Sequence, residues 1–569
     1  MRISKLIAAL FLLIASCVMM RSQQPAPTPK KTDEPVTNGA IDGKVVNESG
    51  QAMSGATVFV RAVNSAGSGR TTTADSEGNF HVSGLEPALY TVSANAPAYT
   101  MASASDPFSP TYYRIGDTVR IELVRGGAIT GTVTNASGEP VVAIRVRATM
   151  IRDARGEAAK LVALVSTEQP TDDRGVYRIF GLRPGTYIVS AGGSGFGYSF
   201  NPYDQDLPTF APSATRDTAA EILVRSGEDS NIDIRYRGEP GHLISGTVKL
   251  AGTNGAALAL TQAGSPVPFA NTFQPPAARG FNFTGLGDGD YDIVAQEIAS
   301  DPNATTTPSF SVSEPKRVSV KGADVTGIEM STRPLSSISG KIALEPSKAP
   351  ECQGKRPPLF AEMVVRLQKP DVDKDKEDML ALRFLSSSAS PDANGAFQLR
   401  NLVSGKYQFE PRFFARYWYL QSIAVTTGTP KPQRVDAAAN WTTVKPGEQL
   451  SNLTITLAQG AASIRGRVVV AEGAAAPTSL YLVPAEPDKV NDVLRYFVSN
   501  VGDDLTFTFN NLPPGRYLTY LDTQTTTLKK LRQPEASPER LKVRRSAETK
   551  KNEIELKPCQ NLVDYQLKP

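Results

Sequence analysis

The stretch FGLRPGTYIV, residues 180–189, belongs to a pattern that occurs five times in the chain. In every copy a tyrosine follows the opening aromatic residue after ten positions. A spacing that returns five times marks an internal repeat, and a repeat decides the architecture before any other signal. The copies are FHVSGLEPALY from Phe80, YRIFGLRPGTY from Tyr177, FNFTGLGDGDY from Phe281, FQLRNLVSGKY from Phe397 and FTFNNLPPGRY from Phe507.

Each copy predicts a β-hairpin. In the first, Phe80 and Val82 alternate with polar residues, which is the pattern of a strand with one buried face. A Gly or Asn and a Leu then lead into a tight turn, and a second strand begins at the tyrosine. Glycine accepts a positive φ there without steric cost. The first turn has Ala88 at this position and is expected to differ, whereas the others have Gly185, Gly289, Gly405 and Gly515.

Further strands flank each hairpin. An Ile-x-Gly strand precedes it, with the glycine at Gly43, Gly131, Gly246, Gly340 and Gly466, and an alternating strand such as NLTITL from Asn452 follows. Short strands with Gly/Pro turns at this spacing predict an all-β sandwich. The 569 residues then form five modules of ordinary domain size, each able to bury its own core. We place them at 39–126, 127–238, 239–333, 334–460 and 461–569, the last with a basic tail.

The N-terminal segment predicts export. Arg2 and Lys5 precede an apolar run, residues 6–15, that is too short to span a membrane as a stable helix. We assign 1–16 to a signal peptide. The sequence Ile14-Ala15-Ser16-Cys17 is similar to a bacterial lipobox, in which the cysteine is lipidated. The alternative is a secretory leader cut a few residues later, with Cys17 discarded. Residues 17–38 are a proline-rich linker that favours an extended spacer.

The modules resemble carboxypeptidase regulatory-like domains. The resemblance is carried by GTVTNASGEPVVAIRVRA from Gly131, by TDDRGVYRIFGLRPGTYIVSA from Thr171 and by GKVVNESGQAMSGATVFVRA from Gly43. It covers nearly all of the chain after the linker. It implies a transthyretin-like (prealbumin-like) Greek-key sandwich of seven strands, grouped with carbohydrate-binding-like folds, and it is typical of exported proteins of Gram-negative bacteria. A fold does not fix a function, so the resemblance supplies an expectation only.

Two cysteines remain under either cleavage of the leader, Cys352 in the fourth module and Cys559 in the fifth. Export permits a disulfide, so one expectation is a bridge that joins the neighbouring modules. The alternative is two unpaired or separately buried thiols.

Residues that commonly carry catalysis are scarce. Of the two histidines, His81 falls on the outward phase of its strand and His242 precedes a strand as a turn residue. Neither has the spacing of a zinc peptidase, and no phosphate-binding loop or nucleophile elbow is visible. We therefore expect no enzyme, no cofactor and no metal. The acidic turns TDDRG from Thr171 and SPDANG from Ser390 could hold calcium, but aspartate also starts turns by bonding its own backbone, which we favour.

Aromatic residues are the candidate ligand site, because sugars stack on flat rings. The densest cluster is RFFARYWYLQSI from Arg412, and we take Trp418, Tyr417 and Tyr419 as candidate carbohydrate contacts. Since these tyrosines alternate with the tryptophan, one ring set belongs to a core, so core or module packing is the competing interpretation. A second set lies in an insertion of the second module and fits either a binding loop or a seam between modules. Its members are Phe196, Tyr198, Phe200, Tyr203 and Phe210.

The charge excludes one class of partner. The formal net charge is +4, and it moves closer to zero once Arg2 and Lys5 leave with the leader, so nucleic acid is not expected. The tail 529–551 is basic and either meets an anionic envelope polymer or is a solvated face, which we favour.

These observations predict a non-catalytic exported protein of the cell envelope, either anchored to the outer membrane as a lipoprotein or periplasmic or extracellular. The leading expectation is a binding or adhesion array with polysaccharide as its ligand class. The alternative is a structural spacer or assembly protein that binds other envelope proteins through strand edges. Membrane contact is expected only through the N-terminal lipid anchor.

Overall fold

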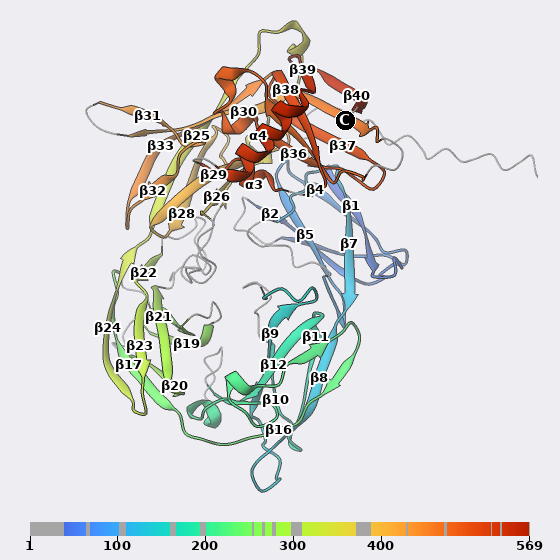
Figure 1. Cartoon of the computed structure of the whole chain (residues 1–569). Helices are drawn as coiled ribbons and strands as arrows, with labels where there is room; N and C mark the ends of the chain where they lie inside the picture. Colours follow the sequence, from blue (N-terminus) through green and yellow to red (C-terminus); the bar gives the residue numbers. More distant parts are fainter. Residues whose placement is uncertain are drawn as a thin grey trace, which may run out of the picture. The chain divides into compact units, whose positions relative to one another are not determined.

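The computed structural model of the chain describes residues 39–63, 69–101, 110–159, 167–193, 201–252, 255–263, 268–275, 280–297, 310–370, 388–427, 431–470, 475–524, 526–534 and 537–567. The segments expected to be a signal peptide (1–16) and a linker (17–38), with Cys17, lie outside these residues. Strands account for 56% and helices for 8% of the structure, which confirms the predicted all-β class. The strands follow one another in chain order through five successive modules (Figure 1).

Among the described residues, the first module has seven strands and the second has a longer series with an insertion. The strands of the first are β1 (Gly39–Asn47), β2 (Thr57–Ala62), β3 (Arg70–Thr73), β4 (Asn79–Leu85), β5 (Tyr90–Asn95), β6 (Tyr99–Met101) and β7 (Thr118–Arg125). Those of the second are β8 (Gly127–Thr134), β9 (Arg145–Asp153), β10 (Thr167–Pro170), β11 (Val176–Leu182), β12 (Gly185–Ala191), β13 (Thr209–Phe210), β14 (Ile222–Val224), β15 (Asp229–Asn231) and β16 (Ile234–Arg235), with short 3-10 helices η2 (Pro202–Gln205) and η3 (Arg216–Thr218).

The third and fourth modules follow the same plan. The third contains β17 (His242–Lys249), β18 (Ala256–Gln262), β19 (Pro268–Gln274), β20 (Gly280–Leu286), β21 (Gly289–Glu297), β22 (Ser311–Ser313), β23 (Lys316–Val320) and β24 (Val325–Pro334). The fourth contains β25 (Ser336–Glu345), η4 (Pro350–Cys352), η5 (Phe360–Glu362), β26 (Met363–Gln368), β27 (Ser388–Ala389), β28 (Ala396–Leu402), β29 (Gly405–Phe413), β30 (Trp418–Thr427), β31 (Gln433–Asp436), β32 (Thr442–Val444) and β33 (Gln449–Gln459).

The fifth module adds helices to the plan. It contains β34 (Ala462–Val468), β35 (Ser479–Pro484), η7 (Pro487–Lys489), η8 (Val493–Arg495), β36 (Phe497–Asn500), β37 (Thr506–Leu512), β38 (Gly515–Asp522), α3 (Leu528–Leu531), α4 (Pro538–Lys550), β39 (Glu553–Leu556) and β40 (Asn561–Leu567).

Each module is built from the same two sheet motifs. In the first module the sheets have the orders β4-β1-β7-β6 and β3-β2-β5. In all five modules the opening strand pairs antiparallel with the first strand of the hairpin and parallel with the closing strand. In the third module β22 joins the two motifs into one continuous sheet. The repeated β-sandwich plan predicted from the hairpin is therefore confirmed.

The parallel pair explains the Ile-x-Gly signature. A Cβ added to Gly131 would lie 1.9 Å from the carbonyl oxygen of Ile232 on the closing side of the module. At Gly466 the corresponding distance, to the carbonyl oxygen of Tyr565, is 2.0 Å. Real Cβ atoms do not approach backbone oxygen this closely, so glycine is required where the two parallel segments meet.

The Gly or Asn before the hairpin leucine is a β-bulge. Its φ is positive in every copy, between 57° and 72°, and the pairing register shifts next to it. The five residues are Gly84, Gly181, Gly285, Asn401 and Asn511. Glycine and asparagine are the residues that adopt this left-handed conformation most readily, which explains why the copies alternate between them.

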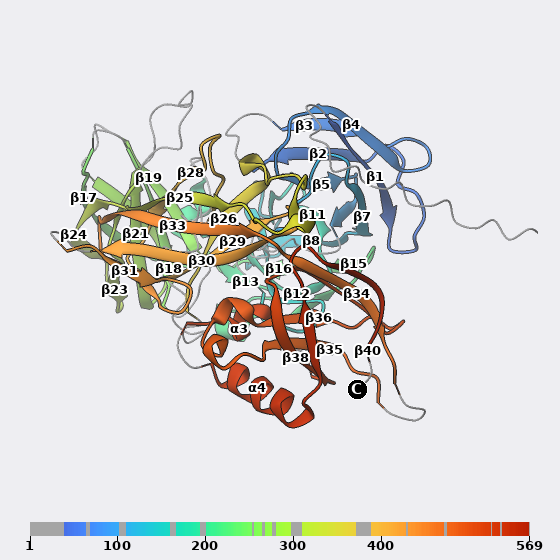
Figure 2. The same cartoon turned by 90° about the horizontal axis from the view of Figure 1, so that it is seen from above.

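The basic tail is partly packed, which the sequence did not predict. Helix α4 begins after Ser537, whose hydroxyl accepts from the backbone N–H of Arg540, and buries Val543 and Ala547 against Tyr481. Figure 2 shows α4 beside strands β35 and β38. Arg544 donates to the carbonyl oxygen of Pro484 at 2.6 Å. The tail is therefore not a uniformly solvated face.

Candidate functional site

Trp418 does not form a sugar-binding surface. Its side chain is 2% exposed and belongs to the core of the fourth module together with Tyr407 and Ile423. The indole N–H donates to the carbonyl oxygen of Arg356 at 3.3 Å. Because Trp418 occupies the inward phase of β30, its ring cannot stack on a ligand from solvent. The assignment of Trp418 as a carbohydrate contact is therefore wrong, and the packing interpretation of this ring holds.

Tyr417 and Tyr419 lie on the other phase and are half-buried. The Lys355 ammonium lies 4.8 Å and the Arg416 guanidinium 5.5 Å from the centroid of the Tyr417 ring, within the range of cation–π attraction. The carbonyl oxygen of Tyr417 accepts from the backbone N–H groups of Gly460 and Ala461, where the fifth module begins. Burial raises the pKa of Tyr419. The aromatic cluster thus lies at a junction between modules.

The two cysteines meet at the same junction. The structure joins Cys352 and Cys559 in a disulfide with a Cα–Cα distance of 5.4 Å and a sequence separation of 207. Hydrogen bonds surround the bridge. The N–H of Cys559 donates to the carbonyl oxygen of Gly460 at 3.0 Å, and the side-chain amide of Gln459 donates to that of Cys352 at 3.0 Å. The fourth and fifth modules are therefore linked both covalently and by backbone contacts.

The bulge residues of the last three modules face the preceding module. The Asn511 amide donates to the carbonyl oxygens of Ala415 (2.8 Å) and Trp418 (2.7 Å). Asn401 accepts from the backbone N–H of Phe310 at 2.9 Å. A Cβ on Gly285 would lie 2.5 Å from the carbonyl oxygen of Asp206, in the second module. The sequence shows that the bulge residue changes from Gly to Asn between copies. Its contacts with the preceding module join segments far apart in the chain, so the sequence does not reveal them.

Arg532 completes the seam between the fourth and fifth modules. Its guanidinium donates to the carbonyl oxygens of Tyr496 and Leu494 at 3.0 and 2.9 Å and lies 4.6 Å from the centroid of the Phe497 ring. Its own carbonyl oxygen accepts from the Gln408 side chain at 2.6 Å. Burial lowers the pKa of Arg532 to about 10. Sequence reasoning placed this arginine in the basic tail and missed its structural role.

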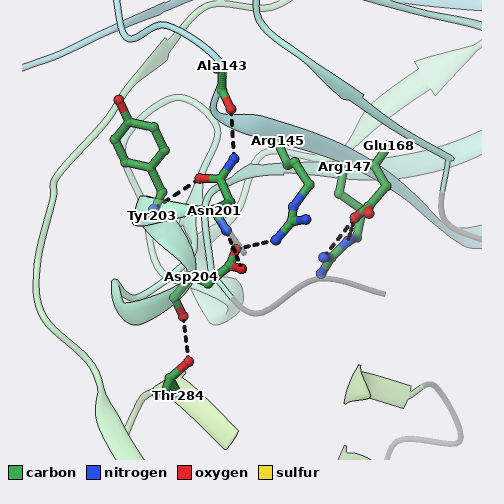
Figure 3. A network of polar contacts seen from close by, with 8 residues as sticks. All are labelled: Ala143, Arg145, Arg147, Glu168, Asn201, Tyr203, Asp204 and Thr284. Carbon is green, nitrogen blue, oxygen red and sulfur yellow. Dashed lines mark hydrogen bonds and ion pairs between the residues drawn. The ribbon is translucent and has the colours of Figure 1, made fainter. Parts of the chain in front are cut away.

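The insertion of the second module is also used for packing (Figure 3). Asn201 begins η2 with a capping box that involves Asp204, and its amide donates to the carbonyl oxygen of Ala143 at 2.8 Å. Asp204 forms an ion pair with Arg145, and its carbonyl oxygen accepts from the Thr284 hydroxyl at 3.0 Å, which links the second and third modules. Of the aromatic residues expected here, Tyr203 and Phe210 pack against the module; Phe196, Tyr198 and Phe200 lie outside the described residues.

His81, His242 and Asp172 all lie within the described residues. His81 is exposed, as expected, and its Nδ1 lies 2.6 Å from the Asp42 carboxylate. His242 begins β17 and is not the turn residue that the sequence indicated. The Asp172 carboxylate accepts from the N–H groups of Arg174 and Val176 in its own turn, which is the backbone role we favoured over calcium. Within the described ranges, no three His, Cys, Asp or Glu residues are grouped as metal ligands.

Comparison with known proteins identifies the first module. Residues 40–111 match the family model of the carboxypeptidase regulatory-like domain. The first module is such a domain. A comparison with curated proteins gives no match.

Solved structures with similar segments include a pilin and the B repeat units of a collagen binding protein. The TIE protein of Bacillus anthracis is 15% identical, with 52% of this chain and 51% of that chain covered and a TM-score of 0.14, so the match spans about half of that protein's length. The minor pilin GBS52 of Streptococcus agalactiae is 12% identical, with 36% and 97% covered and a TM-score of 0.20. Two B repeat units of the collagen binding protein of Staphylococcus aureus are 12% identical, with 74% and 100% covered and a TM-score of 0.13.

Among the helices that the structure describes, none has the length and apolar character needed to cross a membrane.

Proposed function

We propose that the chain is a non-catalytic array exported to the cell envelope, where its modules act in binding or adhesion. The observation that carries the proposal is that tyrosine and cysteine side chains, which could be reactive, have structural roles here. The five repeat tyrosines bond backbone carbonyls within their own hairpins, and two cysteines bridge adjacent modules. Repetition of one sandwich suits a tethered array, because each unit is stabilised mainly by itself and its neighbours.

Carbohydrate is the ligand class that we propose first. The support is the resemblance of the modules to carbohydrate-binding-like folds, together with a first module that matches the regulatory-like family. The buried Trp418 cannot be part of such a site, so the contact surface belongs on another module. Tyr417 and Tyr419 lie at the junction between the fourth and fifth modules, and we no longer assign them to the carbohydrate site.

The test is a binding screen with the chain from Gln24 onward, which keeps every described residue. Soluble and insoluble polysaccharides, including peptidoglycan and lipopolysaccharide, are titrated and binding isotherms are recorded. Saturable binding to at least one glycan supports the proposal. Failure of all glycans to bind contradicts the carbohydrate assignment and leaves the second candidate.

That second candidate is a structural spacer or assembly protein that binds other envelope proteins. The disulfide and the bonds of Asn511 favour it, because a seam held in this way fixes one module against the next. Chemical cross-linking in intact cells would then capture envelope proteins specifically, and a Cys352→Ser/Cys559→Ser chain would change the pattern of cross-links.

Anchoring through a lipid on Cys17 is part of the same proposal. Metabolic labelling with a fatty acid should mark the wild-type chain and leave Cys17→Ser unlabelled and released from the membrane fraction. Equal labelling of both chains would contradict it.

A further inference from the structure

One exposed aromatic ring lies in the middle of a sheet face rather than in a loop. Phe59 is on β2, the central strand of the sheet β3-β2-β5 in the first module, and its side chain is 42% exposed. It pairs with Thr71 on one side and with Ser93 on the other. Cross-strand partners have their side chains on the same face of a sheet. A phenyl ring is therefore flanked directly by two hydroxyl groups.

The rest of this face is polar but almost uncharged. Two residues before Phe59, Thr57 pairs with Thr73 and Asn95; two residues after it, Arg61 pairs with Thr91. These residues are exposed or half-buried. We call the group the Phe59 face, and it consists of Thr57, Phe59, Arg61, Thr71, Thr73, Thr91, Ser93 and Asn95. It carries hydroxyls, one amide, one guanidinium and one ring, with no carboxylate and no ammonium group.

The residue equivalent to Phe59 is buried or half-buried in each of the other modules. The position of Phe59, counted along the pairing from each hairpin tyrosine, is taken by Arg147, Ala259, Arg366 and Tyr481. The Arg147 side chain is 11% exposed and bonds Glu168 at 3.0 and 2.9 Å (Figure 3). Ala259, Arg366 and Tyr481 are 0%, 6% and 1% exposed, the last beneath α3 and α4. Among the five, only Phe59 is open to solvent.

We propose that the Phe59 face binds an uncharged polysaccharide. A sugar ring has an apolar C–H face and a rim of hydroxyls, so its flat face can pack on Phe59 while the flanking Thr, Ser and Asn side chains exchange hydrogen bonds with the rim. Threonine is β-branched and stiff at χ1, which lowers the entropy lost on binding. The inference rests on the proposed carbohydrate-binding function and gives it a site.

The size of the face favours a glycan over a protein. Three strands about 4.8 Å apart and five residues long, at about 3.3 Å per residue, cover on the order of 200 Å². A stable protein interface needs roughly 800 Å² per partner and a core of several apolar side chains. One phenyl ring among hydroxyls does not meet that requirement. A single guanidinium, Arg61, is also too little charge to hold a polyanion.

The test uses the chain from Gln24 onward and neutral probes: amylose, xylan, cello-oligosaccharides and mixed-linkage β-glucan. Lipopolysaccharide serves as the charged comparison. Phe59→Ala should weaken binding of the neutral glycan about tenfold or more, as expected for the loss of one aromatic contact. Phe59→Tyr keeps the ring and should bind like the wild type. Phe180→Ala removes another exposed phenylalanine, on β11 of the second module, and is the matched control.

The possible outcomes distinguish failure of the proposed site from failure of the proposed function. Loss of binding in Phe59→Ala alone, with an unchanged melting temperature, supports the inference. Saturable glycan binding that Phe59→Ala leaves intact keeps the proposed function and overturns this site. No binding of any glycan by the wild type overturns both. Concentration-dependent dimers in sedimentation analysis, abolished by Phe59→Ala, would instead assign the face to a second copy of the chain.

Discussion

Tyr407 explains why each copy of the repeat closes with a tyrosine and not with a phenylalanine. Its ring is fully buried, and its hydroxyl donates to the carbonyl oxygen of Val403, four residues earlier, at 2.6 Å. The same bond across four residues occurs in the other four modules, at Tyr90, Tyr187, Tyr291 and Tyr517. The ring fills the core while the hydroxyl donates to a carbonyl at the start of the tight turn.

Replacing Tyr407 by phenylalanine should lower the free energy of unfolding of the fourth module by about 1–2 kcal/mol, because the carbonyl of Val403 loses its donor. Urea denaturation followed by hydrogen exchange would measure the change. Tyr520→Phe is the control, since the hydroxyl of Tyr520 makes a long, part-buried bond of 3.4 Å to Asp522. Equal stability of Tyr407→Phe and wild type would contradict this account.

Gly131 provides a second test at this scale. Gly131→Ala places a methyl group where the carbonyl oxygen of Ile232 would be 1.9 Å away. We expect a loss of about 3 kcal/mol or more, because neither parallel segment can move without breaking its pairing. Gly280→Ala is a matched substitution in a strand whose nearest atom is 3.4 Å from the added Cβ, and it should cost about 1 kcal/mol or less. Thermal melting would compare the stability of the two variants. Similar melting temperatures would contradict a steric clash at Gly131.

At the scale of elements, the repeated hairpin could be predicted and its irregularity could not. Alternation at Phe80 and Val82 was enough to place the strands. The bulge at Gly84, by contrast, depends on a register shift against β1 that no local pattern reveals. Helix α4 was missed for a different reason. Its start is signalled by Ser537 followed by Pro538, a common capping sequence, but only two of its residues are buried, so the apolar periodicity is weak.

Asn511 allows the two roles of the bulge to be separated. Asn511→Gly keeps the left-handed conformation but loses both bonds to the fourth module, and should weaken the coupling between modules by about 1–3 kcal/mol. Asn511→Ala should cost about 1–2 kcal/mol more, because alanine is strained at this φ. Hydrogen exchange in β30 and β37 would report the two effects. If the glycine variant matched the wild type, the bonds to Ala415 and Trp418 would have no energetic role.

For the whole molecule, the sequence predicted the repeated modules but not the contacts that join one module to the next. Five hairpins imply five sandwiches, but which residues join them depends on contacts between segments far apart in the chain. Trp418 shows the difficulty: its strand phase allowed either an inward or an outward ring, and only the packed core selects the inward one. Phe59 shows the converse, because within the described residues it is exposed at a position where the other modules have a buried or half-buried residue.

Reducing the Cys352–Cys559 bridge should lower the melting temperature of the last two modules. Opening a loop closed over a sequence separation of 207 restores chain entropy to the unfolded state, worth up to about 5 kcal/mol. Calorimetry with and without dithiothreitol would measure the effect, and a non-reducing digest should yield the linked peptides. Cys352→Ser/Cys559→Ser is the control, and its melting should be insensitive to dithiothreitol. A reductant effect of the same size in that chain would rule out the bridge as its cause.

The same bridge has a mechanical consequence. If a pull were applied between the first module and the C-terminal end, tension would enter the fourth module, cross from Cys352 to Cys559 and leave through β40. The chain between the two cysteines, which includes most of both modules, would carry no load along its backbone. Unfolding could not release this length, so a chain under shear would extend through its first three modules and through the strands outside the bridge, β25 before Cys352 and β40 after Cys559.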